Sequence, residues 1–200
     1  DGSGRERRRE EGFLDLSIDV ASGDVLSSLH EEFNTPELLK ESEGNGWRPE
    51  KDAPKVDALK GSLLRVPGLP SVLQLHLKRF SFDWMTESMS KINDRVVFPE
   101  VLNLKSICAT RDGEEEGEGD ESLVTYDLQS VVIHVGEYGR GHYYSYVRPD
   151  IREKEWYRFD DDKVTEVSLK EVLADSFGGR ADLEEGGDEM TSTQETGGLL

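Results

Sequence analysis

The segment YDLQSVVIHVGEYGRGHYYSYVRPDIREKEWYRFDDDKV, residues 126–164, decides the fold of this 200-residue chain. Within it, residues 142–148 and 155–160 are rich in side chains that favour β-strands. The turn-forming pair of proline and aspartate follows the first of these runs directly. The segment therefore predicts an antiparallel hairpin in which Arg148 pairs with Lys154.

This register places a histidine opposite a carboxylate. His142 would lie directly across from Asp160, with the two Cβ atoms about 5 Å apart. Asp161 would point to the other face, unless a β-bulge moves the pairing to it. An aspartate that accepts a hydrogen bond from one imidazole nitrogen fixes the tautomer and leaves the other nitrogen as a base. A histidine at a strand edge can also have no chemical role, but the carboxylate opposite His142 favours the base.

An imidazole paired with an acid is the arrangement that activates a cysteine nucleophile, and the chain contains one cysteine, Cys108. No helix start and no basic neighbour lies beside Cys108 to lower the pKa of its thiol. We therefore expect Cys108 to be a buried or half-buried residue at a strand end. A single cysteine also excludes a disulfide framework and a four-cysteine zinc site within this chain.

Four segments in a fixed order carry a resemblance to a known family. They are LPSVLQLHLKRF (69–80), KINDRVVFP (91–99), YDLQSVVIHVG (126–136) and the hairpin with GHYYSYV and WYRFDDDKV (141–164). Together they resemble the catalytic domain of ubiquitin-specific proteases over about residues 11–179. The absence of cysteine pairs makes the resemblance closest to the herpesvirus-associated subclass.

The resemblance implies an α+β fold of the papain-like cysteine peptidase type. The chain would be the C-terminal half of that catalytic domain, with a mainly antiparallel β palm and fingers portion and a few short helices, and so an incomplete domain. The implied reaction is hydrolysis of the isopeptide bond after the terminal glycine of ubiquitin, through a thioester with an active-site cysteine. In that reaction His142 would be the general base, Asp160 the group that orients it, and Asp161 a second polar catalytic residue.

The resemblance also implies partners and a binding channel. Ubiquitin and ubiquitinated proteins would be the partners, and Gly141 and Tyr143 would flank the channel for the C-terminal tail of ubiquitin, with His134 near it. We expect no cofactor and no metal. A metal site built from His134, His142 and the three aspartates 160–162 is a weaker reading, because no helical His-x-x-x-His spacing supports it.

Three parts of the family pattern are not found in this sequence: the segment with the nucleophilic cysteine, the oxyanion donor beside it, and an apolar last palm strand. We therefore expect the chain to be inactive alone, with the missing N-terminal half of the catalytic domain as a further partner. The alternative is a non-catalytic ubiquitin-binding or scaffold module. The matched pair His142 and Asp160 favours the enzyme, because a module without catalysis does not need it.

Charge divides the chain into an ordered part and acidic segments. The chain has 24 basic and 43 acidic residues and a net charge of −19. We expect a disordered basic leader at 1–10, an acidic disordered insertion at 109–122 and a disordered acidic tail at 180–200. Such a chain is a poor nucleic-acid ligand, since phosphate affinity comes from Lys and Arg. No apolar run reaches membrane-spanning length, and a cytoplasmic or nuclear location is expected.

Periodicity predicts two strands outside the hairpin. Residues 13–20 alternate apolar and polar side chains, which is typical of a strand with one buried face. That face would contain Leu14, Leu16, Ile18 and Val20. Residues 126–135 would form one continuous central strand covered on both faces.

Capping signals predict three helices. Asp24 is expected to cap an amphipathic helix, and the Thr35-Pro36 pair to begin a short second one. Ser168 and Glu171 have the spacing of a capping box and predict a helix that ends near residues 178–179.

Overall fold

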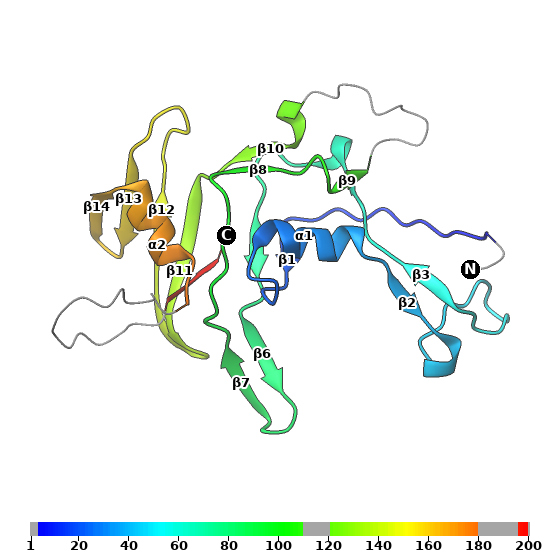
Figure 1. Ribbon diagram of the computed structural model, residues 1–200. Helices are drawn as coiled ribbons and strands as arrows, with labels where there is room; N and C mark the ends of the chain where they lie inside the picture. The colour runs from blue at the N-terminus through cyan, green and yellow to red at the C-terminus, as the bar shows by residue number, and fades with distance from the viewer. Residues whose placement is uncertain (1–3, 110–120, 180–195, 200) are drawn as a thin grey trace.

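The structure is a computed structural model, and it describes residues 4–109, 121–179 and 196–199. Its strands are mainly antiparallel and its helices are few and short, which confirms the predicted α+β class (Figure 1). The helices are α1 (Val25–Asn34), α2 (Leu169–Ser176) and three 3-10 turns, η1 (Glu41–Glu43), η2 (Val66–Gly68) and η3 (Glu121–Val124). In the described part of the chain, no helix is long and apolar enough to cross a membrane.

The largest sheet has five strands in the order β14-β13-β12-β11-β15, each antiparallel to its neighbours. Their bounds are β11 (Ser130–Glu137), β12 (Arg140–Val147), β13 (Trp156–Asp160), β14 (Lys163–Val167) and β15 (Thr196–Leu199). A two-residue turn joins β11 to β12, because Glu137 pairs with Arg140 and Gly139 supplies a left-handed φ of 76°. In Figure 1, α2 lies beside β12 and β13.

β15 lies in the segment 180–200, for which we expected disorder. Thr196–Leu199 pair with residues 132–135 of β11, so this part of β11 has a strand on each side. The remaining residues of this segment, 180–195 and 200, lie outside the described residues. So do residues 110–120, which make up most of the predicted acidic insertion.

The other strands form short pairs around α1, with the β2–β3 pair on the side away from the large sheet (Figure 1). Parallel pairs are β1 (Leu16–Ile18) with β5 (Leu75–Leu77) and β4 (Leu64–Arg65) with β9 (Cys108–Ala109). Antiparallel pairs are β2 (Glu37–Leu39) with β3 (Ala58–Lys60), β6 (Phe80–Asp83) with β7 (Ser88–Lys91), and β8 (Val101–Asn103) with β10 (Thr125–Asp127).

Three predictions about these elements were wrong. The expected helix at Thr35-Pro36 is the strand β2, because residues 37–39 pair with β3. The expected continuous strand 126–135 is split, since β10 pairs with β8 whereas β11 pairs with β12. Val132 in β11 is also 42% exposed, so the strand is not covered on both faces. The third wrong prediction concerns Leu14, which was expected on the buried face of a strand over residues 13–20. Leu14 lies before β1 and is 90% exposed.

Two of the three predicted helix starts, at Asp24 and Ser168, are confirmed. The side chain of Asp24 accepts a hydrogen bond from the backbone N–H of Ser27 and caps α1. Ser168 and Glu171 form both bonds of a capping box at α2.

One apolar core joins α1, β1, β5 and the large sheet, with the fully buried Trp156 among its members. The large sheet is therefore anchored to the rest of the chain.

Candidate active site

His142 and Asp160 are in contact on one face of the large sheet. Nε2 of His142 lies 2.5 Å from Oδ1 of Asp160, across the β12–β13 pair. The His142 side chain is 49% exposed and that of Asp160 is 28% exposed, so the pair lies at the surface. With Asp160 accepting from Nε2–H, Nδ1 is the nitrogen left for proton transfer. In the described part of the chain, no hydrogen bond engages that Nδ1.

The strand register differs from the predicted one by two residues. Ser145 pairs with Phe159, and the same register puts Asp160 opposite Tyr144. The predicted pair of Arg148 with Lys154 does not form, because the observed register continues to Arg148 opposite Trp156. A shift of two residues keeps the side chains on the same face, so His142 reaches Asp160 diagonally.

Asp161 is closer to His142 than its strand position suggested. It lies in the two-residue turn between β13 and β14 and has a left-handed φ of 51°, a conformation that aspartate tolerates. Outside an extended strand, side chains no longer alternate between faces. Single ligand atoms of His142, Asp160 and Asp161 consequently lie within 4.8 Å of one another. These three residues are the ones in the described chain that could approach a cation together.

The electrostatics of the pair suit a base that must accept a proton. The hydrogen bond to Asp160 raises the pKa of His142, and the negative charges of Asp160 and Asp161 act in the same direction. The hydrogen bond from His142 lowers the pKa of Asp160, and the positive charge of Arg158 lowers it further. Both shifts favour an imidazolium beside a carboxylate, which is the ion pair formed when the base has taken a proton.

The predicted tail-binding residues gather on the other face of β12. His134 pairs with Tyr143, which follows His142 and therefore points away from it. The two rings lie 4.6 Å apart, and His134 is only 4% exposed. Burial lowers the pKa of His134, and the nearby positive charge of Lys91 lowers it further. The structure thus brings His134 and Tyr143 together but does not bring His134 to His142.

Gly141 completes this second group. A Cβ atom at Gly141 would collide with Nε2 of His134 and with the carbonyl oxygen of Val135. The missing side chain therefore makes room for the imidazole of His134. The weak metal reading, which combined His134 with His142 and the aspartates, is not supported by this arrangement, because strand alternation separates the two histidines.

Cys108 lies apart from the histidine pair in β9, which pairs with β4 in a different sheet. It is partly buried, and burial raises the pKa of its thiol. A nucleophilic cysteine needs a lowered pKa. The expected half-buried position of Cys108 at a strand end is confirmed.

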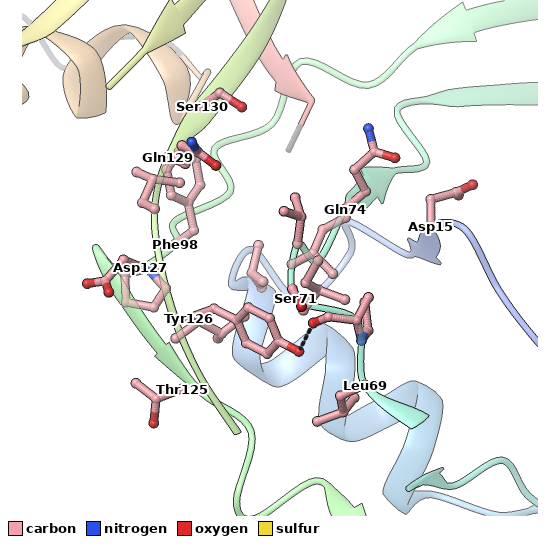
Figure 2. Close-up of a pocket in the computed structure, with 18 of the residues that line it drawn as sticks. Asp15, Leu69, Ser71, Gln74, Phe98, Thr125, Tyr126, Asp127, Gln129 and Ser130 are labelled. Atoms are coloured by element: carbon pink, nitrogen blue, oxygen red, sulfur yellow. Dashed lines mark hydrogen bonds between the residues drawn. The ribbon is translucent and has the colours of Figure 1, made fainter. Parts of the chain in front are cut away.

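Sequence reasoning missed a cavity of about 940 Å³. Figure 2 shows Asp15 and Gln74 on one side of it and Phe98, Asp127 and Gln129 on the other. The hydroxyl group of Tyr126 donates to the carbonyl oxygen of Pro70 across its floor, at 2.7 Å. The lining includes the exposed apolar side chains of Val72, Val132 and Ile151. Apolar alternation in a strand predicts a buried face, but it does not indicate which residues of that face remain exposed to solvent.

Comparisons with known proteins agree on one family. Residues 24–186 match the family model described as ubiquitin carboxyl-terminal hydrolase. The chain is 36% identical over 179 residues to ubiquitin carboxyl-terminal hydrolase 15 of Schizosaccharomyces pombe, covering 87% of this chain and 14% of that protein. It is 38% identical over 182 residues to ubiquitin C-terminal hydrolase 12 of Arabidopsis thaliana, covering 88% of this chain and 15% of that protein. The chain thus spans about one-seventh of the length of these relatives.

Solved structures give the same result. A SAGA DUB module bound to ubiquitin aldehyde superimposes with a TM-score of 0.65 at 30% identity, covering 80% of this chain and 33% of that one. The same kind of module bound to monoubiquitin gives a TM-score of 0.63, also at 30% identity and the same coverage. These likenesses confirm the papain-like fold class.

Proposed function

The chain belongs to the ubiquitin carboxyl-terminal hydrolase family, and we propose that it provides the histidine and aspartate of a deubiquitinating cysteine protease. The observation that carries this proposal is the hydrogen bond between Nε2 of His142 and Oδ1 of Asp160. The carboxylate of Asp160 orients the exposed imidazole and leaves its Nδ1 available to accept a proton. A general base needs such an oriented and accessible nitrogen. The substrate would be an isopeptide bond after the terminal glycine of ubiquitin.

The chemistry follows from the pair. Nδ1 of His142 takes the proton of a cysteine thiol, and the thiolate attacks the carbonyl carbon of the scissile bond. The imidazolium then gives its proton to the leaving amine of the conjugated lysine, and a thioester remains. His142 next takes a proton from water, which attacks the thioester carbon; the C–S bond breaks, the cysteine leaves as a thiolate beside the imidazolium, and the ubiquitin carboxyl group loses its proton to solvent. Asp160 holds Nε2–H and stabilises the imidazolium in both halves, with Asp161 as a second nearby carboxylate.

The nucleophile in this proposal lies outside the chain. Cys108 is in a different sheet from the pair, and burial raises its pKa rather than lowering it. The chain would therefore be the C-terminal half of the catalytic domain of a longer protein, of the herpesvirus-associated subclass, and inactive alone. The chain covers only 33% of the solved relatives' chains, which is consistent with a further part of the domain in a longer protein.

The 940 Å³ cavity is the surface we assign to that second part. Val72, Val132 and Ile151 expose 67%, 42% and 52% of their surface at its rim, and large apolar side chains exposed together mark an interaction site. The proposed occupant is the cysteine-bearing part of the same protein, because two-thirds of the solved relatives' chains lies outside the part that this chain matches.

The tail of ubiquitin would lie along the face of β12 that carries Tyr143. This ring is 54% exposed and rests against the buried imidazole of His134, which gives a rigid apolar surface. The space of a side chain at Gly141 is filled by the imidazole of His134, which holds that ring beside Tyr143. His134, Gly141 and Tyr143 are thus the proposed site for the tail, with Tyr143 as its exposed contact and with His134 and Gly141 supporting the Tyr143 ring.

The test is hydrolysis of a ubiquitin C-terminal fluorophore conjugate by the chain assembled with the cysteine-bearing part. Substitution His142→Ala is expected to lower kcat/KM by about 10²–10⁴-fold. The matched control is His30→Ala, since His30 lies in α1, outside both the pair and the cavity, and its partners are Asn34 and the hydroxyl group of Ser106. Ubiquitin binding by the assembly with no hydrolysis would instead identify a non-catalytic ubiquitin-binding module.

A further inference from the structure

Arg158 lies between the orienting aspartate and a tyrosine ring. Its Nη2 donates to Oδ2 of Asp160 at 2.8 Å, while Oδ1 of the same carboxylate receives Nε2–H of His142. The guanidinium carbon stands 4.0 Å from the ring centroid of Tyr144. Both oxygens of Asp160 are therefore engaged, each by a different side chain.

Tyr144 is itself fixed from the helix side. Its side chain is buried, and its hydroxyl group donates to Oδ2 of Asp175 in α2 at 2.6 Å. Tyr146 donates to the same oxygen at 2.9 Å, and the two rings meet edge to face at 5.8 Å. α2 is held in turn by its capping box and by the buried Val172. A continuous series of contacts therefore connects Asp175 in α2, through Tyr144, Arg158 and Asp160, to the imidazole of His142.

We propose that Arg158 is a positioning residue that holds the carboxylate of Asp160 in the orientation that binds His142, with Tyr144 and Asp175 holding Arg158 in place. This inference rests on the proposed function of His142 as the base. A guanidinium suits the task because it is planar, stacks on an aromatic face and donates N–H groups in a fixed geometry. Without it, the Asp160 carboxylate would be free to rotate about its side-chain bonds.

Positioning and simple charge have opposite effects on the imidazole. The charged groups that act on His142 are Asp160, Asp161 and Arg158; Asp175, on the helix packed against this face, lies behind Tyr144. As a charge, Arg158 disfavours the imidazolium. As a positioning group, it preserves the hydrogen bond to Asp160 that favours the imidazolium. The direction in which the pKa of His142 moves when Arg158 is removed therefore separates the two roles.

The test is an NMR pH titration of the His142 ring in the complete 200-residue chain. Substitution Arg158→Gln removes both the positive charge and the planar guanidinium with its N–H donors. We expect the pKa of His142 to fall towards the usual histidine value. Arg158→Lys, which restores a charge and single N–H donors, should recover part of the shift. Arg152→Gln is the matched control, because Arg152 in the β12–β13 loop pairs with Asp150 and not with the site.

A rise in the pKa of His142 in Arg158→Gln, or no change, would overturn the proposal. Unchanged ring signals of His76 and His134 would show that the variant is folded, so a fall could not be assigned to unfolding. Tyr144→Leu removes the ring under the guanidinium and should lower the pKa of His142, whereas Tyr144→Phe keeps the ring and should lower it less. A larger fall in Tyr144→Phe would contradict the stacking role.

This titration needs no substrate, so its outcome is independent of whether the assembled protein hydrolyses ubiquitin conjugates. In an active assembly, Arg158→Gln should lower kcat by roughly ten- to a hundred-fold with little change in KM, and the acid limb of the pH–rate profile should move to lower pH. A fall in the pKa of His142 without any movement of that limb would leave the positioning role intact and contradict His142 as the base.

Discussion

Substitution Gly141→Ala is expected to destabilise the chain by forcing β11 and β12 apart beside His142. A Cβ atom there would overlap Nε2 of His134 and the carbonyl oxygen of Val135. His134 is 4% exposed and its ring packs against Tyr143 and Phe80, so moving the ring would disturb both contacts. Overpacking of this kind costs about 1–3 kcal/mol, and the backbone overlap places Gly141→Ala in the upper half of that range.

Urea unfolding monitored by tryptophan fluorescence measures this loss of unfolding free energy. Gly68→Ala is the matched control, since a Cβ atom at Gly68 meets no atom within 4 Å, and its effect should stay within about 0.5 kcal/mol. Gly141→Ala should cost about 1 kcal/mol less in a His134→Ala background than in the wild-type chain, because one of the two overlaps is then absent. Equal stability of Gly141→Ala and Gly68→Ala would refute the steric argument.

Other predictions concern the supports of the fold and the titration of the site. Arg79 is 1% exposed and donates to three backbone carbonyls, so Arg79→Met should cost about 3 kcal/mol in urea unfolding, whereas the exposed neighbour Lys78→Ala should cost under about 0.5 kcal/mol. Asp24→Ala removes the cap of α1 and should cost about 1 kcal/mol by the same assay; a cost near zero would contradict the capping bond. The hydrogen bond to Asp160 raises the pKa of His142, so its stabilisation is fully present below the usual pKa of 6.5 and is lost as pH rises through the raised value. His142→Gln should remove that decline from a stability–pH profile, and an unchanged profile would contradict the pairing.

The sequence was sufficient to predict the histidine–aspartate pair but not its register. Side chains alternate along a strand, so a register wrong by two residues still puts His142 and Asp160 on one face. The position of Asp161 depends on a left-handed turn residue, which alternation cannot predict. The same alternation separates His134 from His142. His134 pairs with Tyr143 and shares its face, whereas the adjacent residue His142 points to the opposite face.

Short sequence motifs predicted structure correctly where it depends on neighbouring residues. They failed where the structure depends on pairing with a segment far away in the sequence. The caps at Asp24 and Ser168 depend on residues three positions away, and both were predicted. Residues 37–39 form a strand only because residues 58–60 lie beside them. The contacts of Arg158 with Tyr144, and of Tyr144 with Asp175, likewise join three separate elements, and no spacing in the sequence indicates them.

The pKa of His142 in the complete chain, compared between wild type, Asp160→Asn and Asp161→Asn, tests the central claim most directly. If Asp160 orients the base, the wild-type pKa lies above 6.5, Asp160→Asn lowers it clearly, and Asp161→Asn lowers it less, because only Asp160 makes the hydrogen bond. A wild-type pKa at the usual value, or one that Asp160→Asn leaves unchanged, would contradict the account.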